Sequence, residues 1–203
     1  MGSEMCIRDR SVLVHSRMLT YAHVLDFDTK FRGLLSSLPI FLRPDPTLEQ
    51  LPEVRQEQAQ RPYLAMHRLI VFEAVNQRLL VLHRDDMCRG HHDEKYAYST
   101  RVAVDAARTI LSCRQQIDNV HPAVQKHAAF RHHLFQAAIV LSIHLLELSH
   151  KAQGSSQVAH QLRDDIALIM NYLYGSNNLR TSLPVPQKIA LKLIEMLLAE
   201  AHE

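Results

Sequence analysis

The stretch from residue 61 to residue 84 limits what this chain can fold into more than any other part of its 203 residues. Its sequence is RPYLAMHRLIVFEAVNQRLLVLHR, with a proline in the first turn, where a missing N–H costs nothing. Apolar residues recur at helical spacing, and others widen the stripe well beyond one narrow face. A helix that is apolar over most of its circumference has to be covered by neighbours. The stretch therefore predicts the buried central helix (61–84) of an all-α domain.

The rest of the chain predicts further helices around this central one. An amphipathic helix is expected before Pro39, with its apolar face formed by Met18, Ala22, Leu25, Phe31, Leu34, Leu35 and Leu38. Residues 43–57 contain three prolines and predict a polar connection without a helix. Residues 85–95 predict a charged loop. Later helices are expected over 96–115, from the His121-Pro122 cap to a stop at Gly154, over 158–173, and from Pro184 to Leu197, which makes about six helices in all.

The composition is that of a single globular domain. Apolar residues make up 47% and charged residues 22%, while five glycines and no tryptophan favour helix over sheet. We expect one all-helical domain over residues 12–203, a length that suits one core rather than two. Residues 1–11 show no periodicity, and we expect them to be either a disordered terminus or a sequence artefact.

Charge and cysteine content exclude several classes of function. A formal net charge of +2, with both signs interspersed, is too small to indicate nucleic-acid binding by this chain itself. The three cysteines, Cys6, Cys88 and Cys113, form no CxxC pair, so neither a zinc ribbon nor a redox motif is predicted, and the sparse count favours a reducing compartment. The longest apolar run, residues 137–148, falls well short of the roughly 20 residues that a membrane span needs.

The end of the central helix carries a pattern seen in a known family. Leu82, His83 and Arg84 are followed by a polar loop and then by Tyr98, Ser99, Arg101, Ala106 and Ala107. This pattern resembles the middle homology region, the regulatory domain of fungal zinc-cluster transcription factors. That family usually has Pro-Phe where this chain has Asp85-Asp86. The resemblance extends over about residues 20–112.

The resemblance implies a function in transcription rather than catalysis. The domain would hold an activator inactive, would respond to a small effector, a corepressor or a coactivator, and would contribute to a homodimer in the nucleus. In that family DNA is bound by an N-terminal six-cysteine cluster holding two zinc ions. Three scattered cysteines cannot build such a cluster, so we expect no cofactor in this chain and DNA contact only through a missing N-terminal domain, the chain being a fragment.

The family-signature residues His83, Arg84, Tyr98, Ser99 and Arg101 have two interpretations. They could shape an effector pocket or a switch surface at the end of the central helix. Alternatively, Arg84 complements the helix dipole and pairs with a nearby aspartate, while His83 forms hydrogen bonds inside the core. We favour the structural interpretation.

Two other classes of function stay open at this point. His91, His92 and Asp93, with His83 or the histidines at 127, 132 and 133 nearby, could form the metal site of a helical enzyme, although no HExxH motif occurs. No GxSxG motif or glycine-rich phosphate loop occurs, and Cys88 beside Arg89 is more simply a surface thiol. The remaining alternative is a helical scaffold that binds partner proteins.

Overall fold

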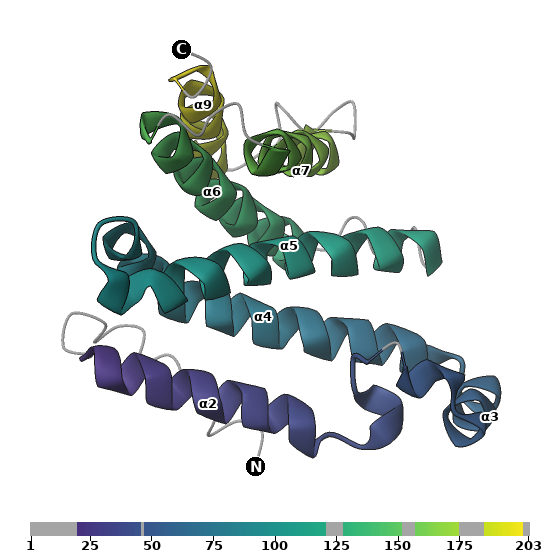
Figure 1. The fold of residues 1–203 in the computed structure, drawn as a ribbon. Coiled ribbons are helices and arrows are strands. Elements are labelled where there is room, and N and C mark those ends of the chain that lie inside the picture. Colours follow the sequence, from purple (N-terminus) through teal and green to yellow (C-terminus); the bar gives the residue numbers. More distant parts are fainter. Residues whose placement is uncertain (1–19, 46, 121–127, 152–156, 175–184, 201–203) are drawn as a thin grey trace.

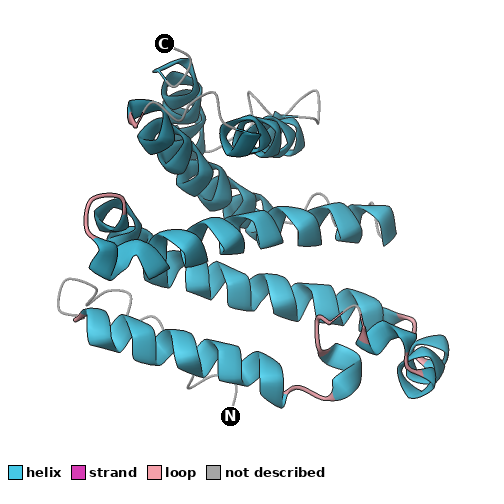
Figure 2. Cartoon of the chain, viewed as in Figure 1, coloured by secondary structure: helices cyan, strands magenta, loops and turns pink. Residues whose placement is uncertain are grey.

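The computed structural model describes residues 20–45, 47–120, 128–151, 157–174 and 185–200, and almost all of these residues are helical (Figure 1, Figure 2). The α-helices in this part of the chain are α2 (Tyr21–Ser37), α3 (Pro52–Gln60), α4 (Tyr63–Gly90), α5 (Ala97–Val120), α6 (Ala128–His150), α7 (Gln157–Tyr174) and α9 (Val185–Glu200). Short 3-10 helices, η2 (Ile40–Leu42), η3 (Leu48–Gln50) and η4 (Glu94–Tyr96), connect some of them. The all-α fold predicted from the sequence is confirmed.

The helices pack in two groups, which are joined by the contact between α5 and α6. Helices α2, α4 and α5 lie side by side, with α4 between the other two (Figure 1). Helix α6 packs against α5 and leads away from this layer, and it carries α7 and α9 (Figure 1). The core is continuous across both groups, because buried residues of α4, α5, α6, α7 and α9 belong to one cluster.

Helix α4 is the predicted central helix. Its buried residues are Leu64, Met66, Arg68, Glu73, Val75, Asn76, Gln77, Leu79, Leu80, His83, Asp86 and Met87. It extends six residues beyond the predicted end, so the charged loop expected from residue 85 is wrong. Asp86 is only 8% exposed and pairs with Arg89 across one turn at 3.0 Å, and Met87 is 1% exposed. Because Asp86 and Met87 are buried and Asp86 is paired, the helix continues through this polar stretch.

The connection before α4 is also more regular than predicted. Helix α3 occupies residues that were expected to lack a helix. Pro52 stands in its first turn, where proline is compatible with a helix, and Glu53 lies beside it at the positive end of the helix dipole. Val54 is fully buried and ties the short helix to the body. A proline in the first turn of a helix does not interrupt it, so the presence of Pro52 did not exclude a helix here.

Helix α2 buries only part of the face that was expected, since Phe31 and Leu35 pack against the core as predicted but Leu25 and Leu34 do not. Leu25 and Leu34 are 38% and 37% exposed, whereas Val24 and Asp28 are each 4% exposed. Phe31 packs against the core from the same side as Val24 and Asp28. The inner face therefore includes a carboxylate, which the apolar pattern alone did not predict.

Close packing between α5 and its neighbours uses small side chains. Ala103 and Ala107 of α5 and Ala137 and Ala138 of α6 are all fully buried. Alanines at these positions let helix axes approach closely.

Several expectations fall outside the described residues. These are the terminal residues 1–11, Met18 of the first predicted helix, the His121-Pro122 cap, His127, the stop at Gly154, and the proline at 184. Within the part of the chain that the structure describes, no helix is both long enough and apolar enough to cross a membrane.

Candidate functional site

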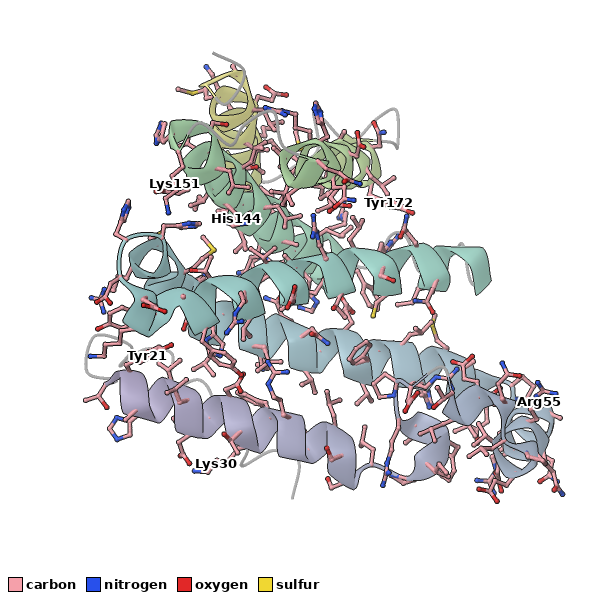
Figure 3. The ribbon with its side chains drawn as sticks, in the orientation of Figure 1. Tyr21, Lys30, Arg55, His144, Lys151 and Tyr172 are labelled. Atoms are coloured by element: carbon pink, nitrogen blue, oxygen red, sulfur yellow. The ribbon has the colours of Figure 1, made fainter. Side chains whose placement is uncertain are left out.

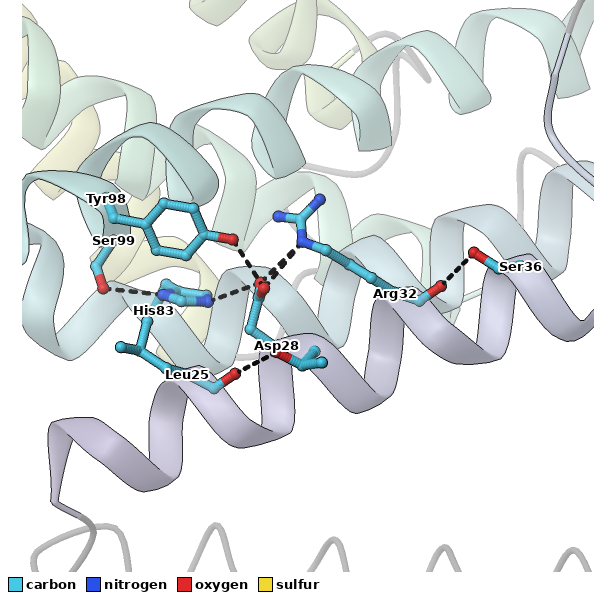
Figure 4. Close-up of polar contacts among 8 residues, drawn as sticks. Leu25, Asp28, Arg32, Ser36, His83, Tyr98 and Ser99 are labelled. Carbon is cyan, nitrogen blue, oxygen red and sulfur yellow. Dashed lines mark hydrogen bonds and ion pairs between the residues drawn. The ribbon is translucent and has the colours of Figure 1, made fainter.

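A buried polar cluster lies where α2, α4 and α5 meet (Figure 4). We call it the Asp28 cluster; its members are Tyr21, Asp28, Arg32, His83, Tyr98 and Ser99. The Asp28 carboxylate accepts hydrogen bonds from Arg32 Nε at 2.9 and 3.2 Å and from the Tyr98 hydroxyl at 2.8 Å. His83 Nε2 lies 3.1 Å from the same carboxylate, and its Nδ1 lies 2.9 Å from Ser99 Oγ. The Ser99 and Tyr21 hydroxyls are 3.2 Å apart.

Helical spacing explains how the sequence assembles this cluster. Asp28 follows Val24 by four residues and therefore shares its buried face, and Arg32 follows Asp28 by the same interval. His83 lies one turn beyond Leu79 on the buried face of α4 and is itself fully buried. Residues 98 and 99 belong to the first turn of α5. The short helix η4 reverses the direction of the chain, so this turn lies beside the end of α4.

Burial and charge decide the protonation states of the pair at the centre. Burial is the largest influence on Asp28 and acts to raise its pKa, but the hydrogen bonds from Arg32 and Tyr98 and the Arg32 charge together hold that pKa below its ordinary value. Burial lowers the pKa of His83, and this effect outweighs the opposing attraction of the Asp28 carboxylate. At neutral pH the cluster therefore contains an ionised aspartate and a neutral histidine.

Because His83 is neutral, the donor and the acceptor of each hydrogen bond in the cluster can be assigned. An ionised carboxylate only accepts, so the single ring proton of His83 belongs on Nε2, facing Asp28. Its Nδ1 then accepts from the Ser99 hydroxyl, whose oxygen is left as an acceptor for the Tyr21 hydroxyl. The described polar groups at the centre are thus satisfied without a charged histidine.

Serine, histidine and aspartate in line resemble a catalytic triad, but the arrangement here does not suit nucleophilic catalysis. In that mechanism the serine faces Nε2 of the histidine and the aspartate faces Nδ1, the reverse of this order. Ser99 and His83 are both 0% exposed, so no substrate can reach the hydroxyl. The geometry instead joins three helices through one carboxylate.

The structure brings together some of the family-signature residues and separates the others. His83, Tyr98 and Ser99 lie in the Asp28 cluster. Arg84 points away, with its side chain 46% exposed and its Nε 3.3 Å from Asp85, and it lies six residues before the end of α4 rather than at the helix terminus. Arg101 is exposed on α5.

Sequence reasoning missed three members of the cluster, namely Tyr21, Asp28 and Arg32. A signal for Asp28 was present in the sequence. It stands one turn after Val24 and three residues before Phe31, so an aspartate interrupts an otherwise apolar helix face. A charged residue at such a position needs buried partners, which is a reason to search for a histidine or tyrosine elsewhere.

His91, the first of the histidines considered for metal binding, packs against α6. The His91 and His144 rings stack with centroids 5.1 Å apart, and His144 Nδ1 lies 3.4 Å from His91 Nε2. Lys151, the residue after α6, donates from Nζ to the His91 carbonyl at 2.5 Å. Figure 3 shows Lys151 and His144 at this end of α6. Asp93 accepts from the Lys95 backbone N–H and caps η4. Among the residues that the structure describes, no group of three or more histidine, cysteine, aspartate or glutamate side chains could hold a metal ion.

The stacked histidines predict that stability falls in mild acid. Burial, with added repulsion from His91, lowers the pKa of His144 from 6.5 to about 4. The unfolded chain therefore binds a proton more readily than the folded chain, so the stability is complete above pH 6.5 and declines as the pH falls towards 4. Between pH 6.5 and 4 the free energy of unfolding, measured with urea, should fall by about 2 kcal/mol less in the His144→Phe variant than in the wild type.

A matched control for this prediction is His67→Gln, since His67 is an exposed residue on α4. This variant shows what the loss of a solvent-exposed imidazole does by itself. An equal slope for His144→Phe and the wild type would contradict the prediction.

A small pocket of about 270 Å³ lies between α5 and α7. It is lined by Arg108, Leu111, Ser112, Gln115, Gln161 and Asp165. Arg108 Nε donates to Asp165 at 2.9 Å across it. This ion pair joins the two charged residues of the lining.

Comparison with known proteins points to transcription. The chain is 32% identical over 125 residues to the Agnestins biosynthesis cluster transcription factor AgnL11 of Paecilomyces divaricatus, covering 61% of this chain and 17% of that protein. It is 26% identical over 147 residues to the Probable transcription factor lepB of Aspergillus flavus, covering 70% of this chain and 25% of that protein.

The chain is therefore related to proteins named as fungal transcription factors, and it spans a quarter or less of the length of these relatives. No family model matches it, and no solved structure does either.

Proposed function

We propose that this chain is a regulatory domain of the fungal zinc-cluster type of transcription factor and acts in the nucleus without catalysis. The observation that carries the proposal is its similarity to two proteins named as fungal transcription factors, over as many as 147 residues. The all-α fold is in keeping with this, since the family resemblance implies a helical domain.

The Asp28 cluster adds a second line of support. Three of the residues that carry the family resemblance come from two helices and lie in this cluster: His83 and Tyr98 contact the Asp28 carboxylate, and Ser99 contacts His83. The resemblance thus coincides with a set of contacts that stabilise the packing of α2, α4 and α5. We assign these residues the structural role of holding α2 against α4 and α5.

In this proposal the domain controls an activator rather than contacting DNA. Specific DNA binding would belong to a zinc cluster in another part of the protein, with any zinc bound there. This domain would hold the activator inactive, respond to a small effector or to a corepressor or coactivator, and contribute to a homodimer.

A reporter assay tests the proposal. The chain would be inserted between an unrelated DNA-binding domain and a strong activation domain, and compared with a flexible linker of equal length. We expect reporter expression severalfold below that of the linker fusion at equal protein level, because the domain restrains the activation domain or recruits a corepressor. Equal expression from the two fusions would contradict a regulatory role and would favour a helical scaffold.

A further inference from the structure

Helix α2 buries far less apolar surface than the two helices that it packs against, α4 and α5. Of its 17 residues, only Val24 and Asp28 are buried, and one of these two is charged. Phe31 and Leu35 are only partly buried where they meet the core. The neighbouring α5, in contrast, buries a long run of apolar side chains, namely Val102, Ala103, Val104, Ala106, Ala107, Ile110, Leu111, Cys113 and Ile117.

The polar contacts that hold α2 converge on a few atoms. Asp28 connects α2 to His83 of α4 and to Tyr98 of α5. Tyr21 adds a hydroxyl contact to Ser99 and an edge-on ring contact to Tyr96, with centroids 4.7 Å apart. Figure 4 shows Asp28 reaching out from α2 towards the other two helices.

The physical consequences of these two kinds of attachment differ. Apolar burial largely sets how strongly a segment resists local opening, so α2 belongs among the less stable parts of the fold. Buried charged clusters contribute little net stability, because desolvation offsets their attraction, but loss of one partner is costly. Arg32, on α2 itself, has a side chain that is 50% exposed, so one side of the cluster is open to water.

We propose that α2 is a releasable strap: it docks and undocks as a unit, the Asp28 carboxylate fastens it, and α4 to α7 stay folded when it leaves. Release exposes the side of α4 and α5 that carries His83, Tyr98 and Ser99. The domain thereby has two arrangements between which a partner or an effector selects. This inference goes beyond the proposed function and does not depend on it.

Hydrogen exchange measured by mass spectrometry on the full chain tests the strap. In the wild type, amides of α2 should exchange faster than those in the middle of α4 and α5. Asp28→Asn should raise exchange in α2 by about tenfold or more, with little change in α5 and α6, because the neutral amide weakens the contacts with His83 and Tyr98. Tyr98→Phe, which removes a single hydrogen bond, should give a smaller rise in the same segment.

Asp26→Asn is the matched control. Asp26 lies on the same helix, is 56% exposed and pairs only within α2, with Lys30. It should leave the docking of α2 unchanged. The inference fails if wild-type α2 exchanges as slowly as the middle of α5, if Asp28→Asn leaves α2 unchanged, or if exchange rises equally in every helix for both Asp28→Asn and Tyr98→Phe. No DNA or transcription enters this measurement, so its result is separate from that of the reporter assay.

Discussion

Replacing Gly90 by alanine is expected to lower the free energy of unfolding by about 3 kcal/mol. Gly90 ends α4, where the chain turns into η4 and α5. A Cβ atom there would lie 2.2 Å from Thr100 Oγ1 and 2.5 Å from the Tyr96 carbonyl oxygen. Because a backbone atom cannot rotate away as a side chain can, α5 would have to shift. The shift would also disturb the hydrogen bond from Thr100 to the Met87 carbonyl, which is 2.9 Å long.

Gly33→Ala provides the opposite expectation in the same protein. A Cβ at Gly33 would meet nothing within 4 Å, and the residue is exposed in the interior of α2. Alanine is the better helix former, so this variant should be more stable than the wild type by about 0.5–1 kcal/mol, or should protect α2 from hydrogen exchange. Urea denaturation would measure both variants. Similar effects of the two substitutions would contradict the close approach at the α4–α5 turn.

Replacing His83 by alanine is the second substitution with a large expected effect. The imidazole is fully buried and hydrogen-bonded on both nitrogens, to Ser99 and to Asp28. Its removal leaves a cavity and takes a partner from a buried carboxylate, and we expect a loss of about 3 kcal/mol. Because Asp28→Asn weakens the same contacts, the double variant should lose less stability than the sum of the single variants, by about 1 kcal/mol or more.

Arg84→Ala is the control for His83→Ala. The two residues are adjacent on α4 and both belong to the family-signature set, but the Arg84 side chain is 46% exposed and pairs with the exposed Asp85. Its loss should change stability by less than about 0.5 kcal/mol. If Arg84→Ala proved as costly as His83→Ala, or if the effects of His83 and Asp28 were additive, the Asp28 cluster would not be the unit that we describe.

Part of the site could be read from the sequence and part could not. The pattern around residues 82–107 directed attention to His83, Tyr98 and Ser99, which do meet. It directed attention equally to Arg84 and Arg101, which do not join them. A motif names residues without saying which face of a helix each occupies. That face depends on which side of α4 and α5 is covered.

The sequence by itself determined the all-α class and the long central helix, because hydrophobic periodicity is a local property of the chain. Where the structure differs from the sequence-based prediction, contacts between helices determine the local structure. The charged stretch 85–90 stays helical because Asp86 and Met87 face the interior, and the short helix α3 is tied down by the buried Val54.

Asp28 is the clearest example of what only the tertiary structure decided. Alone, an aspartate on an apolar face contradicts the pattern. Arg32 pairs with it from the same helix, but the buried side of the carboxylate is satisfied by His83, 55 residues away, and by Tyr98, 70 residues away. Local propensity sets the helices, whereas the partners of a buried charge depend on how those helices are arranged in space.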